Sequence, residues 1–321
     1  MVLQNTTSRG TSRLDAFFSV PAAAILMAIV CNVLWGSAFP FIKMGYRLFA
    51  IDGSDTASIL CFAGVRFMMG ALLVYLGGAA LRRGPLPMPR GAVLAQCCGL
   101  GLWQTTAQYA FYYSAVAALT GAMGGILNST QSFMGVILAH FLYGKADRMT
   151  VRKALGCALG FGGVLVATLG NHGGGSASGV AYMLIASAIF ALAGPWNKAV
   201  TAKADAFSVS CLNLGVGGAA LLLIGIAMGG SLHPQSAGAV PVLAFLAFIS
   251  GAGYVLWALL MKNNPVSRIA VFGLVIPIMN VLLSALLNGE PLFEWQYLAA
   301  LVLVCVGIYL VNKPKKAVCH D

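Results

Sequence analysis

Basic residues are distributed along this chain in a pattern that constrains its topology. Sixteen of its nineteen lysines and arginines fall into six clusters, and two apolar runs separate each cluster from the next. The clusters are Arg9/Arg13, Arg82/Arg83/Arg90, Lys145/Arg148/Arg152/Lys153, Lys198/Lys203, Lys262/Arg268 and Lys313/Lys315/Lys316. Short basic loops of membrane proteins are retained in the cytoplasm. Two crossings between clusters return the chain to the same side, so the pattern predicts ten transmembrane spans with both termini cytoplasmic.

Three basic residues depart from this pattern. Lys43 and Arg47 follow the first apolar run and are the only two expected on the outer face, while Arg66 lies inside the second run. The net charge of +11 would suggest an anionic partner in a soluble protein. Here the cytoplasmic loops and the anionic lipid beside them account for most of that charge.

The composition agrees with a protein embedded in a lipid bilayer. Sixty per cent of the residues are hydrophobic and eight per cent are charged, and a span needs about 20 apolar residues. We expect spans near 20–42, 57–80, 91–113, 118–142, 152–170, 179–199, 207–229, 240–261, 267–288 and 293–312. They leave cytoplasmic tails at 1–19 and 313–321. The fold class is therefore an all-α polytopic membrane protein.

The first apolar run predicts an uncleaved anchor. The run from Val20 to Ile42 is longer than the core of a signal peptide and lacks a clear small-residue cleavage site. Seven of the eight cysteines fall within spans, and none forms a CxxC pair. This spacing favours reduced, packed thiols over metal ligands or disulfides.

The two halves of the chain share local features. Pro40 and Pro195 stand near the ends of the first and sixth spans, and the segment 141–145 (FLYGK) corresponds to 286–290 (LLNGE). Five spans is an odd number, so the halves 20–170 and 179–312 are expected to lie in opposite orientations in the membrane. Such inverted repeats are typical of transporters that bind substrate near the midplane, between the halves.

Motifs along the chain resemble those of EamA-type proteins of the drug/metabolite transporter superfamily. Residues 35–43 (WGSAFPFIK) resemble the first-span motif, Arg66-Phe67 matches the second span, and Pro277 with residues 289–292 (GEPL) matches the ninth. The resemblance covers residues 20 to 312 and implies ten helices in two inverted EamA repeats. It also implies a central cavity lined mainly by the third, fourth, eighth and ninth helices, and transport of small organic solutes. The chain departs from the family pattern at Ser132, often proline, and Lys145, often glutamate.

Arg66 has two interpretations. A charge this deep in a span is costly unless it is paired or faces water. Its guanidinium could hold a substrate carboxylate by a bidentate contact. Alternatively it bonds to carbonyls at the ends of helices or extends toward the outer surface. The structural role is favoured, because arginine at this place belongs to the family pattern across many substrates.

Acidic residues are missing from the span interiors. All eight lie in tails, loops or span ends, whereas ion-coupled carriers commonly bind the coupling ion with a buried carboxylate. His140 could titrate, but it lies one turn from the cytoplasmic end of its span. These observations favour a facilitator or an exchanger.

Uncharged polar residues gather in four spans and predict a solvated pathway. Gln104, Gln108 and Tyr112 recur at the spacing of one helical stripe, and residues 128–132 (NSTQS) cross the predicted midplane of the fourth span. Polar groups in a helix bundle also serve as contacts between helices, and that alternative stays open for each of them. The candidate substrate-binding residues are Gln104, Gln108, Tyr112, Asn128, Gln131, Tyr254, Trp257 and Asn280, with Arg66 in reserve.

Three classes of function compete for this chain. The preferred one is a secondary transporter in a bacterial plasma membrane that moves an amino acid or related metabolite, with export favoured, by alternating access. The alternatives are a membrane scaffold or sensor and an intramembrane enzyme. The sequence has no HExxH or Walker A motif, and its four histidines lie on scattered segments. We expect no enzymatic activity, no cofactor, no metal and no nucleic-acid partner. The partners are the bilayer and a small solute, and the GxxxG pairs do not by themselves indicate a homodimer.

Overall fold

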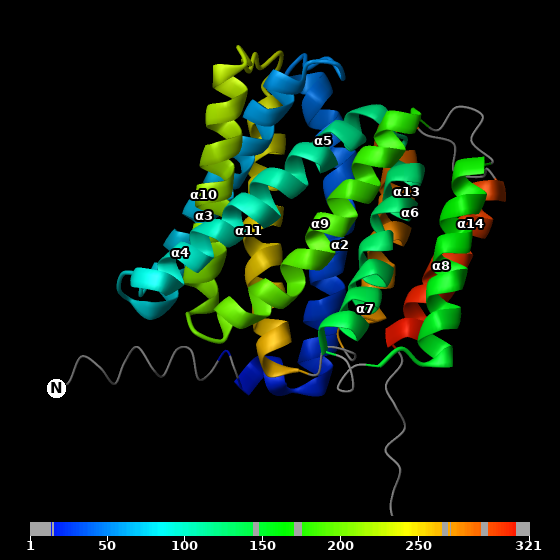
Figure 1. Cartoon of the computed structure of the whole chain (residues 1–321). Helices are drawn as coiled ribbons and strands as arrows, with labels where there is room; N and C mark the ends of the chain where they lie inside the picture. Colours follow the sequence, from blue (N-terminus) through cyan, green and yellow to red (C-terminus); the bar gives the residue numbers. More distant parts are fainter. Residues whose placement is uncertain are drawn as a thin grey trace, which may run out of the picture.

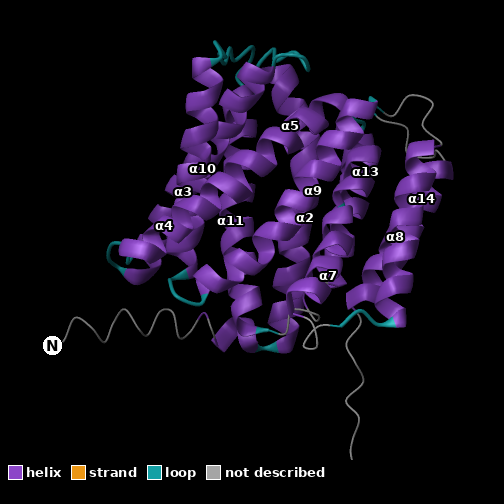
Figure 2. Cartoon of the chain, viewed as in Figure 1, coloured by secondary structure: helices purple, strands orange, loops and turns teal. Residues whose placement is uncertain are grey.

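The computed structural model describes residues 14, 16–143, 148–169, 175–264, 269, 271–289 and 295–312. Within these ranges the chain is helical, and its one β-bridge pairs Leu119 with Gly175 (Figure 2). The α-helices are α2 (Pro21–Leu48), α3 (Thr56–Arg82), α4 (Gly91–Leu100), α5 (Gln108–Ala118), α6 (Gly121–Asn128), α7 (Thr130–Tyr143), α8 (Val151–Leu169), α9 (Ala177–Thr201), α10 (Ala206–Ala227), α11 (Ala239–Asn263), α13 (Val275–Asn288) and α14 (Trp295–Asn312). A π-helix, η1 (Gly101–Ala107), joins α4 to α5, and a 3₁₀ turn, η3 (Val271–Leu274), precedes α13.

Seven of the described helices are long and apolar enough to cross a membrane. They are α2, α3, α8, α9, α10, α11 and α14. The other three predicted spans correspond to shorter pieces. The stretch 91–113 contains α4, η1 and the start of α5, the stretch 118–142 contains α6 and α7, and the stretch 267–288 contains η3 and α13.

The break between α6 and α7 has a local cause. Ser129 Oγ donates a hydrogen bond to the carbonyl of Gly125 at 2.9 Å, and Thr130 Oγ1 donates one to the carbonyl of Leu127 at 2.6 Å. Hydroxyl groups that bond to the preceding turn compete with the backbone ladder of a helix. The five polar residues at 128–132 therefore divide this predicted span into two helices.

The first and sixth helices extend farther beyond Pro40 and Pro195 than the sequence predicted. Both prolines were expected near the ends of their spans, but each lies inside a longer helix, α2 or α9. The helix α2 continues to Leu48, so Lys43 and Arg47 are helical residues. A membrane helix tolerates proline because neighbouring groups satisfy the freed carbonyl.

Packing pairs helices of the first half with helices of the second. α3 packs against α10 and α8 against α14, while α2 packs against α11 and α13, and α9 against α5 and α7. These pairs are consistent with a two-fold arrangement, in which each helix of one half has its counterpart five spans later. The α3–α10 pair is antiparallel, since Gly225 near the end of α10 meets Cys61 near the start of α3. Helices from both halves thus form one bundle (Figure 1).

Glycines allow the closest of these approaches. A Cβ on Gly307 of α14 would lie 2.6 Å from the carbonyl oxygen of Gly156 on α8, and one on Gly218 of α10 would lie 2.9 Å from backbone of α3. Gly156 and Gly225 belong to the GxxxG pairs of the sequence, and both pack inside the monomer. Small residues let helix backbones approach where no hydrophobic force drives them together.

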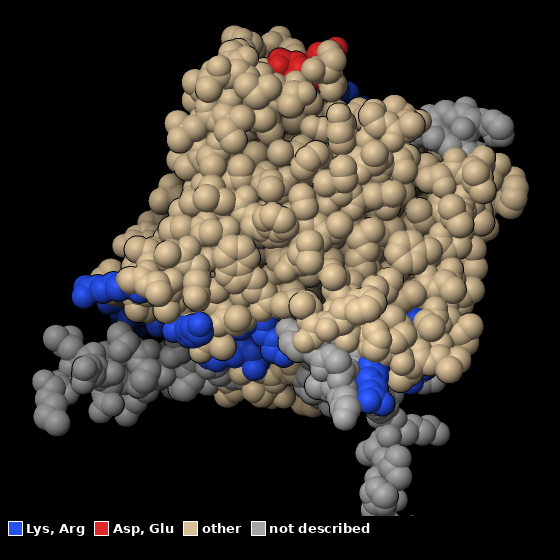
Figure 3. All heavy atoms as spheres, in the orientation of Figure 1, with Lys and Arg blue, Asp and Glu red and all other residues tan. Residues whose placement is uncertain are grey.

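Charge is segregated along the bundle. On the face drawn in Figure 3, lysine and arginine side chains gather at the lower end, and the visible acidic side chains lie at the opposite end. We call the lower end, where α3 ends at Arg82 and α10 begins after Asp205, the basic end. The opposite end carries the loop with Asp52 and Asp55. The surface between the two ends has many exposed leucine, isoleucine and valine side chains, which suits contact with lipid.

Candidate functional site

Arg66 lies at the centre of the bundle, where α3, α5 and α11 meet. Its side chain is 3% exposed. Nε donates to the carbonyl of Leu246 at 3.1 Å and to Ser250 Oγ at 2.9 Å, and Nη1 donates to the hydroxyl of Tyr113 at 2.6 Å. The guanidinium also lies 5.2 Å from the ring centre of Phe67, a distance suited to a cation–π contact.

These contacts give Arg66 a role in joining the two halves. Leu246 and Ser250 lie on α11 in the second half, while Arg66 and Tyr113 lie in the first. A buried guanidinium is tolerated when hydrogen bonds replace its hydration. Leu246 lies within α11 rather than at its end, so this bond differs from the helix-end bond expected from the sequence, and the side chain does not extend to the surface.

Aromatic rings surround this arginine. Phe67 packs against Tyr109 in a tilted arrangement with 4.4 Å between ring centres, and Tyr109 meets Tyr112 at 5.5 Å. Tyr112 in turn packs edge-on against Phe39 of α2 at 6.4 Å. Tyr113 closes the cluster, since its ring also meets Phe67. Of these tyrosines, Tyr112 is a residue that the sequence selected as a candidate.

A second aromatic group joins α2 to α11. Trp35 packs against Trp257 at 5.3 Å and against Tyr254 at 6.5 Å between ring centres. Tyr254 is 9% exposed, and its buried hydroxyl makes no hydrogen bond of normal geometry among the described residues, although the side chains of Tyr109 and Thr105 lie near it. The candidates Tyr254 and Trp257 therefore lie on a helix that also bonds to Arg66, with the first-span tryptophan against them.

Gln104 faces a different part of the bundle. Its Oε1 accepts from Asn197 Nδ2 on α9 at 3.1 Å and from Asn213 Nδ2 on α10 at 3.0 Å. Thr105 Oγ1 donates to Asn213 Oδ1 at 2.6 Å, which completes a buried polar cluster. Thr106 Oγ1 adds a bond to the carbonyl of Gly217 at 3.0 Å.

The π-helix explains why Gln104 and Tyr112 have different neighbours. The sequence placed both on one stripe by assuming α-helical spacing throughout. Residues 101–107 instead form η1, in which hydrogen bonds skip one more residue than in an α-helix. Gln104, within η1, contacts α9 and α10, whereas Tyr112, in α5, packs on α2. The regular α-helical spacing assumed for the stripe therefore does not hold over residues 101–107. π-Helical turns occur frequently at functional sites.

The remaining candidates occupy three settings. Gln108 is 3% exposed, and its Oε1 is buried without a hydrogen-bond partner in the described part of the chain. Asn280 is 2% exposed and packs against Gly125 of α6, and its Oδ1 accepts from Ser284 Oγ at 3.4 Å. Asn128 and Gln131 are half-buried beside the break between α6 and α7.

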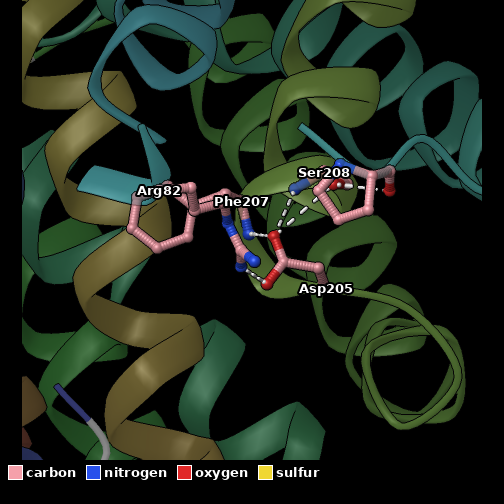
Figure 4. Close-up of polar contacts among 5 residues, drawn as sticks. Arg82, Asp205, Phe207 and Ser208 are labelled. Carbon is pink, nitrogen blue, oxygen red and sulfur yellow. Dashed lines mark hydrogen bonds and ion pairs between the residues drawn. The ribbon is translucent and has the colours of Figure 1, made fainter. Parts of the chain in front are cut away.

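An ion pair lies apart from these residues, at the basic end. Asp205 accepts from Arg82 Nη2, and its carboxylate also caps α10 by accepting from the backbone N–H groups of Phe207 at 3.1 Å and Ser208 at 3.2 Å (Figure 4). Ser208 Oγ bonds to the carbonyl of Pro87 at 3.0 Å. The pair ties the end of α3 to the start of α10 and places this carboxylate outside the helix interiors.

Several groups at the centre were missed or left unassigned by sequence reasoning. Tyr113, Asn197 and Asn213 bond directly to Arg66 or Gln104. Asn213 is the one amide side chain in a largely apolar span, which is a sequence signal that could have identified it. The seven described cysteines are free thiols. Among the described residues no three histidine, cysteine or acidic side chains gather as a metal site.

Comparisons with known proteins show which family and which relatives this chain resembles. The model of the EamA-like transporter family matches residues 22–169 and 177–313. A probable amino-acid metabolite efflux pump of Escherichia coli (strain K12) is 27% identical over 298 residues, covering 89% of this chain and 93% of the pump. The uncharacterized transporter YvbV of Bacillus subtilis (strain 168) is 25% identical and covers 92% of each chain.

A solved structure agrees at the level of the fold. One crystal structure superposes with a TM-score of 0.65 and 19% identity, covering 90% of this chain and 96% of its own. That likeness concerns the arrangement of helices alone.

Proposed function

Because this chain belongs to the EamA-like transporter family, as a multi-pass protein of the cell membrane, we propose that it is a secondary transporter that exports an amino acid or related metabolite. The solute crosses by alternating access, through a pathway between two inverted halves. The E. coli relative named as an amino-acid metabolite efflux pump supports this class of solute and this direction. The packing of α3 on α10 and of α8 on α14 supports the inverted arrangement.

One observation carries the proposed pathway. Gln108 Oε1 is a buried polar atom without a hydrogen-bond partner among the described residues, and the buried hydroxyl of Tyr254 makes no hydrogen bond of normal geometry there. They belong to α5 and α11, helices of opposite halves that Arg66 connects. An unpaired buried polar atom costs about 1–3 kcal/mol. A native protein retains such an unpaired atom where a solute or water molecule forms a hydrogen bond with it in another conformation. We therefore assign solute contact to Gln108, Tyr254 and the adjoining rings of Tyr112 and Trp257.

The remaining candidates take supporting roles in this proposal. Asn280, Asn128 and Gln131 lie on the α6–α7 and α13 pieces, which are the divided spans of the two halves. Divided helices in corresponding positions are where carriers place substrate contacts. Gln104 holds η1 against α9 and α10. Arg66 holds α11 against α3 and α5, so its protein contacts favour a positioning role.

The placement of the described carboxylates supports a mode of transport. The described acidic residues, Asp52, Asp55 and Asp205, all cap helices or lie in loops at the two ends of the bundle. The described residues therefore supply no carboxylate at the midplane that could bind a coupling proton or sodium ion. We propose exchange or facilitated efflux.

Counterflow in proteoliposomes tests this function. Purified protein is reconstituted with a high internal concentration of one unlabelled amino acid, and uptake of its labelled form is followed without an imposed gradient, across a panel of amino acids and related metabolites. We expect transient accumulation for at least one solute. Gln108→Leu should reduce its rate about tenfold, because a buried polar contact is lost, equivalent to about 1.4 kcal/mol.

The matched control is Tyr182→Phe, at an exposed tyrosine on α9 that faces away from the bundle centre. It should transport at the parent rate. If the folded parent protein moves nothing in the panel, or if both variants behave alike, the proposed pathway is wrong.

A further inference from the structure

A pocket of about 400 Å³ opens at the end of the bundle opposite the basic end. Its lining residues are Lys43, Tyr46, Arg47, Gly53, Ala117, Thr120 and Asn288. Asn288 belongs to the second half and the other six belong to the first, so the pocket lies where the two halves meet. Within this lining a hydrogen bond joins Arg47 of α2 to Asn288 of α13.

Arg47 connects the last turn of α2 to the last turn of α13. Its Nη2 donates to Asn288 Oδ1 at 2.7 Å and to the carbonyl of Leu287 at 3.4 Å. The last carbonyl groups of a helix lack partners within it and carry the negative end of its dipole, so a guanidinium is favourable there. The Arg47 side chain is exposed. Water competes for exposed polar contacts, so this one can separate at a small energetic cost.

The two helices run side by side in the same direction (Figure 1). A Cβ on Gly36 of α2 would lie 2.8 Å from the carbonyl oxygen of Ile276 on α13. Arg47 follows Gly36 along α2 by the same number of residues as Leu287 follows Ile276 along α13. The helices therefore stay together over about 16 Å, at 1.5 Å per residue. The bonds of Arg47 stand at the end of this interface between the halves.

The proposed solute contacts lie deeper in the same interface. Asn280 precedes Asn288 by about two helical turns on α13, and Phe39, whose ring packs on the central tyrosines, precedes Arg47 by about two turns on α2. Ser284 lies on the same stripe of α13, between the two asparagines, and is 1% exposed. The contact between Arg47 and Asn288 therefore stands between the central residues and this end of the bundle.

We propose that the contact between Arg47 and Asn288 is a gate, which closes this end of the pathway in the state described and separates when the transporter opens to this side. The inference rests on the proposed transport function and assigns two residues to its alternating access. Such a mechanism requires contacts between the halves that form in one state and separate in another. The α3–α10 and α8–α14 pairs do not meet this requirement, because glycine contacts hold each pair together at several levels. An exposed polar contact between two helix ends does.

The reactivity of a buried thiol measures how often the gate opens. S284C places a thiol on α13 one turn deeper than Asn288. The purified protein in detergent is treated with an uncharged, water-soluble maleimide, so that loss of a charge does not itself alter the rate, and the parent chain corrects for native cysteines. R47Q should raise the rate at position 284 about threefold, the factor expected from loss of an exposed polar contact. R47K keeps a donor and a charge and should lie between the parent and R47Q.

Asn288 permits a change in either direction. N288L removes the side-chain acceptor and should raise the rate at position 284 as R47Q does. N288D supplies a carboxylate, which accepts from a guanidinium more strongly than an amide does, and should lower that rate about threefold. Combined with R47Q, N288D should lose this effect, because its partner is missing. R83Q, at the basic end, should leave the rate unchanged.

Two further thiols separate opening of the gate from other effects of the same substitution. N280C, about two turns deeper than Asn288, should respond to R47Q by the same factor as S284C, because one opened state exposes both positions. A rise at position 284 alone would mean that only the last turn of α13 frays. Ser187 is 0% exposed on α9, which packs against α5 and α7. S187C should keep the parent rate, and a rise there would mean that the whole bundle loosens.

Several results would overturn the gate. They are an unchanged rate at position 284 in R47Q, a response confined to that position, a matching rise at position 187, and an effect of N288D that persists without Arg47. The thermal unfolding midpoint of each variant, measured in the same detergent, confirms that it is folded. None of these rates requires a solute. Failure of counterflow with the expected rates therefore rejects the transport function, whereas unresponsive rates with successful counterflow reject the gate.

Discussion

At the scale of single residues, Arg66 shows how a buried charge is accommodated in a membrane protein. Its planar guanidinium reaches Leu246 O, Ser250 Oγ and Tyr113 Oη from two nitrogen atoms. A lysine ammonium is a point donor at the end of a flexible chain and cannot reproduce this geometry. The bonds connect α11 of the second half to α3 and α5 of the first.

We predict that Arg66→Lys lowers the thermal unfolding midpoint in detergent by several degrees, a loss of roughly 2 kcal/mol. Tyr113→Phe removes one of the bonds and should cost about 1 kcal/mol. The control is Arg83→Lys, at an exposed arginine of the basic end, which should melt with the parent protein. An unchanged midpoint for Arg66→Lys would mean that the observed bonds do not hold the halves together.

At the scale of helices, α8 and α14 form a pair whose spacing depends on glycine. Gly307 faces Gly156 and Gly160 across the contact, whereas a Cβ at Gly162 of α8 would meet nothing within 4 Å. Both positions are helical, so replacement by alanine has the same intrinsic benefit at each, about 0.5–1 kcal/mol. The two substitutions differ only in what the new methyl group meets.

We predict opposite signs for these two substitutions. Gly162→Ala should leave stability unchanged or raise it slightly. Gly307→Ala should lower it by roughly 1–3 kcal/mol, because the methyl group would lie 2.6 Å from the carbonyl oxygen of Gly156 and would separate the helices. Thermal unfolding of both variants in the same detergent measures the difference. If both are equally stable, α8 and α14 do not pack as closely as described.

The π-helix η1 is the second feature at this scale. It interrupts the regular α-helical spacing between α4 and α5. Gln104, within it, bonds to α9 and α10, while Tyr112, after it, packs on α2. Helical spacing alone could not anticipate this, because the extra residue of a π turn leaves no signature in the hydrophobic pattern.

At the scale of the whole molecule, the segregation of charge sets the orientation in the membrane. Basic side chains gather at one end (Figure 3), and the loop with Asp52 and Asp55 lies at the other. Loops rich in lysine and arginine remain in the cytoplasm. The proposed arrangement therefore has ten spans, with the basic end and both termini inside the cell and the gate of Arg47 and Asn288 outside.

Cysteine labelling in intact cells tests this orientation. Ser54→Cys in the loop between α2 and α3 should react with a membrane-impermeant maleimide added to whole cells. Met88→Cys in the loop between α3 and α4 should react only after the membrane is opened. Both original side chains are exposed, so access is decided by the side of the membrane. The reverse pattern would invert the orientation, and labelling of both in intact cells would contradict the predicted number of crossings between them.

Much of the architecture follows from local features of the chain. Apolar length predicts which segments are helical and long enough to span the bilayer, and seven of the ten predicted spans are single helices of that kind. The family was indicated by short motifs whose order and spacing are readable along the sequence, and the family match confirms it. These properties depend on residues close together in the chain and on their transfer into lipid, so they require no knowledge of the fold.

The contacts of the central site depend on residues far apart in the chain. Arg66 bonds to groups 47, 180 and 184 positions away, and in an apolar span nothing local specifies which neighbouring helix supplies the acceptors. The gathering of Lys43, Arg47 and Asn288 around one pocket likewise requires α2 and α13 to end side by side. Lipid and helix surfaces are equally apolar, so hydrophobicity cannot choose between partner helices. Glycine contacts and polar bonds make that choice, and their partners are known only once the chain has packed.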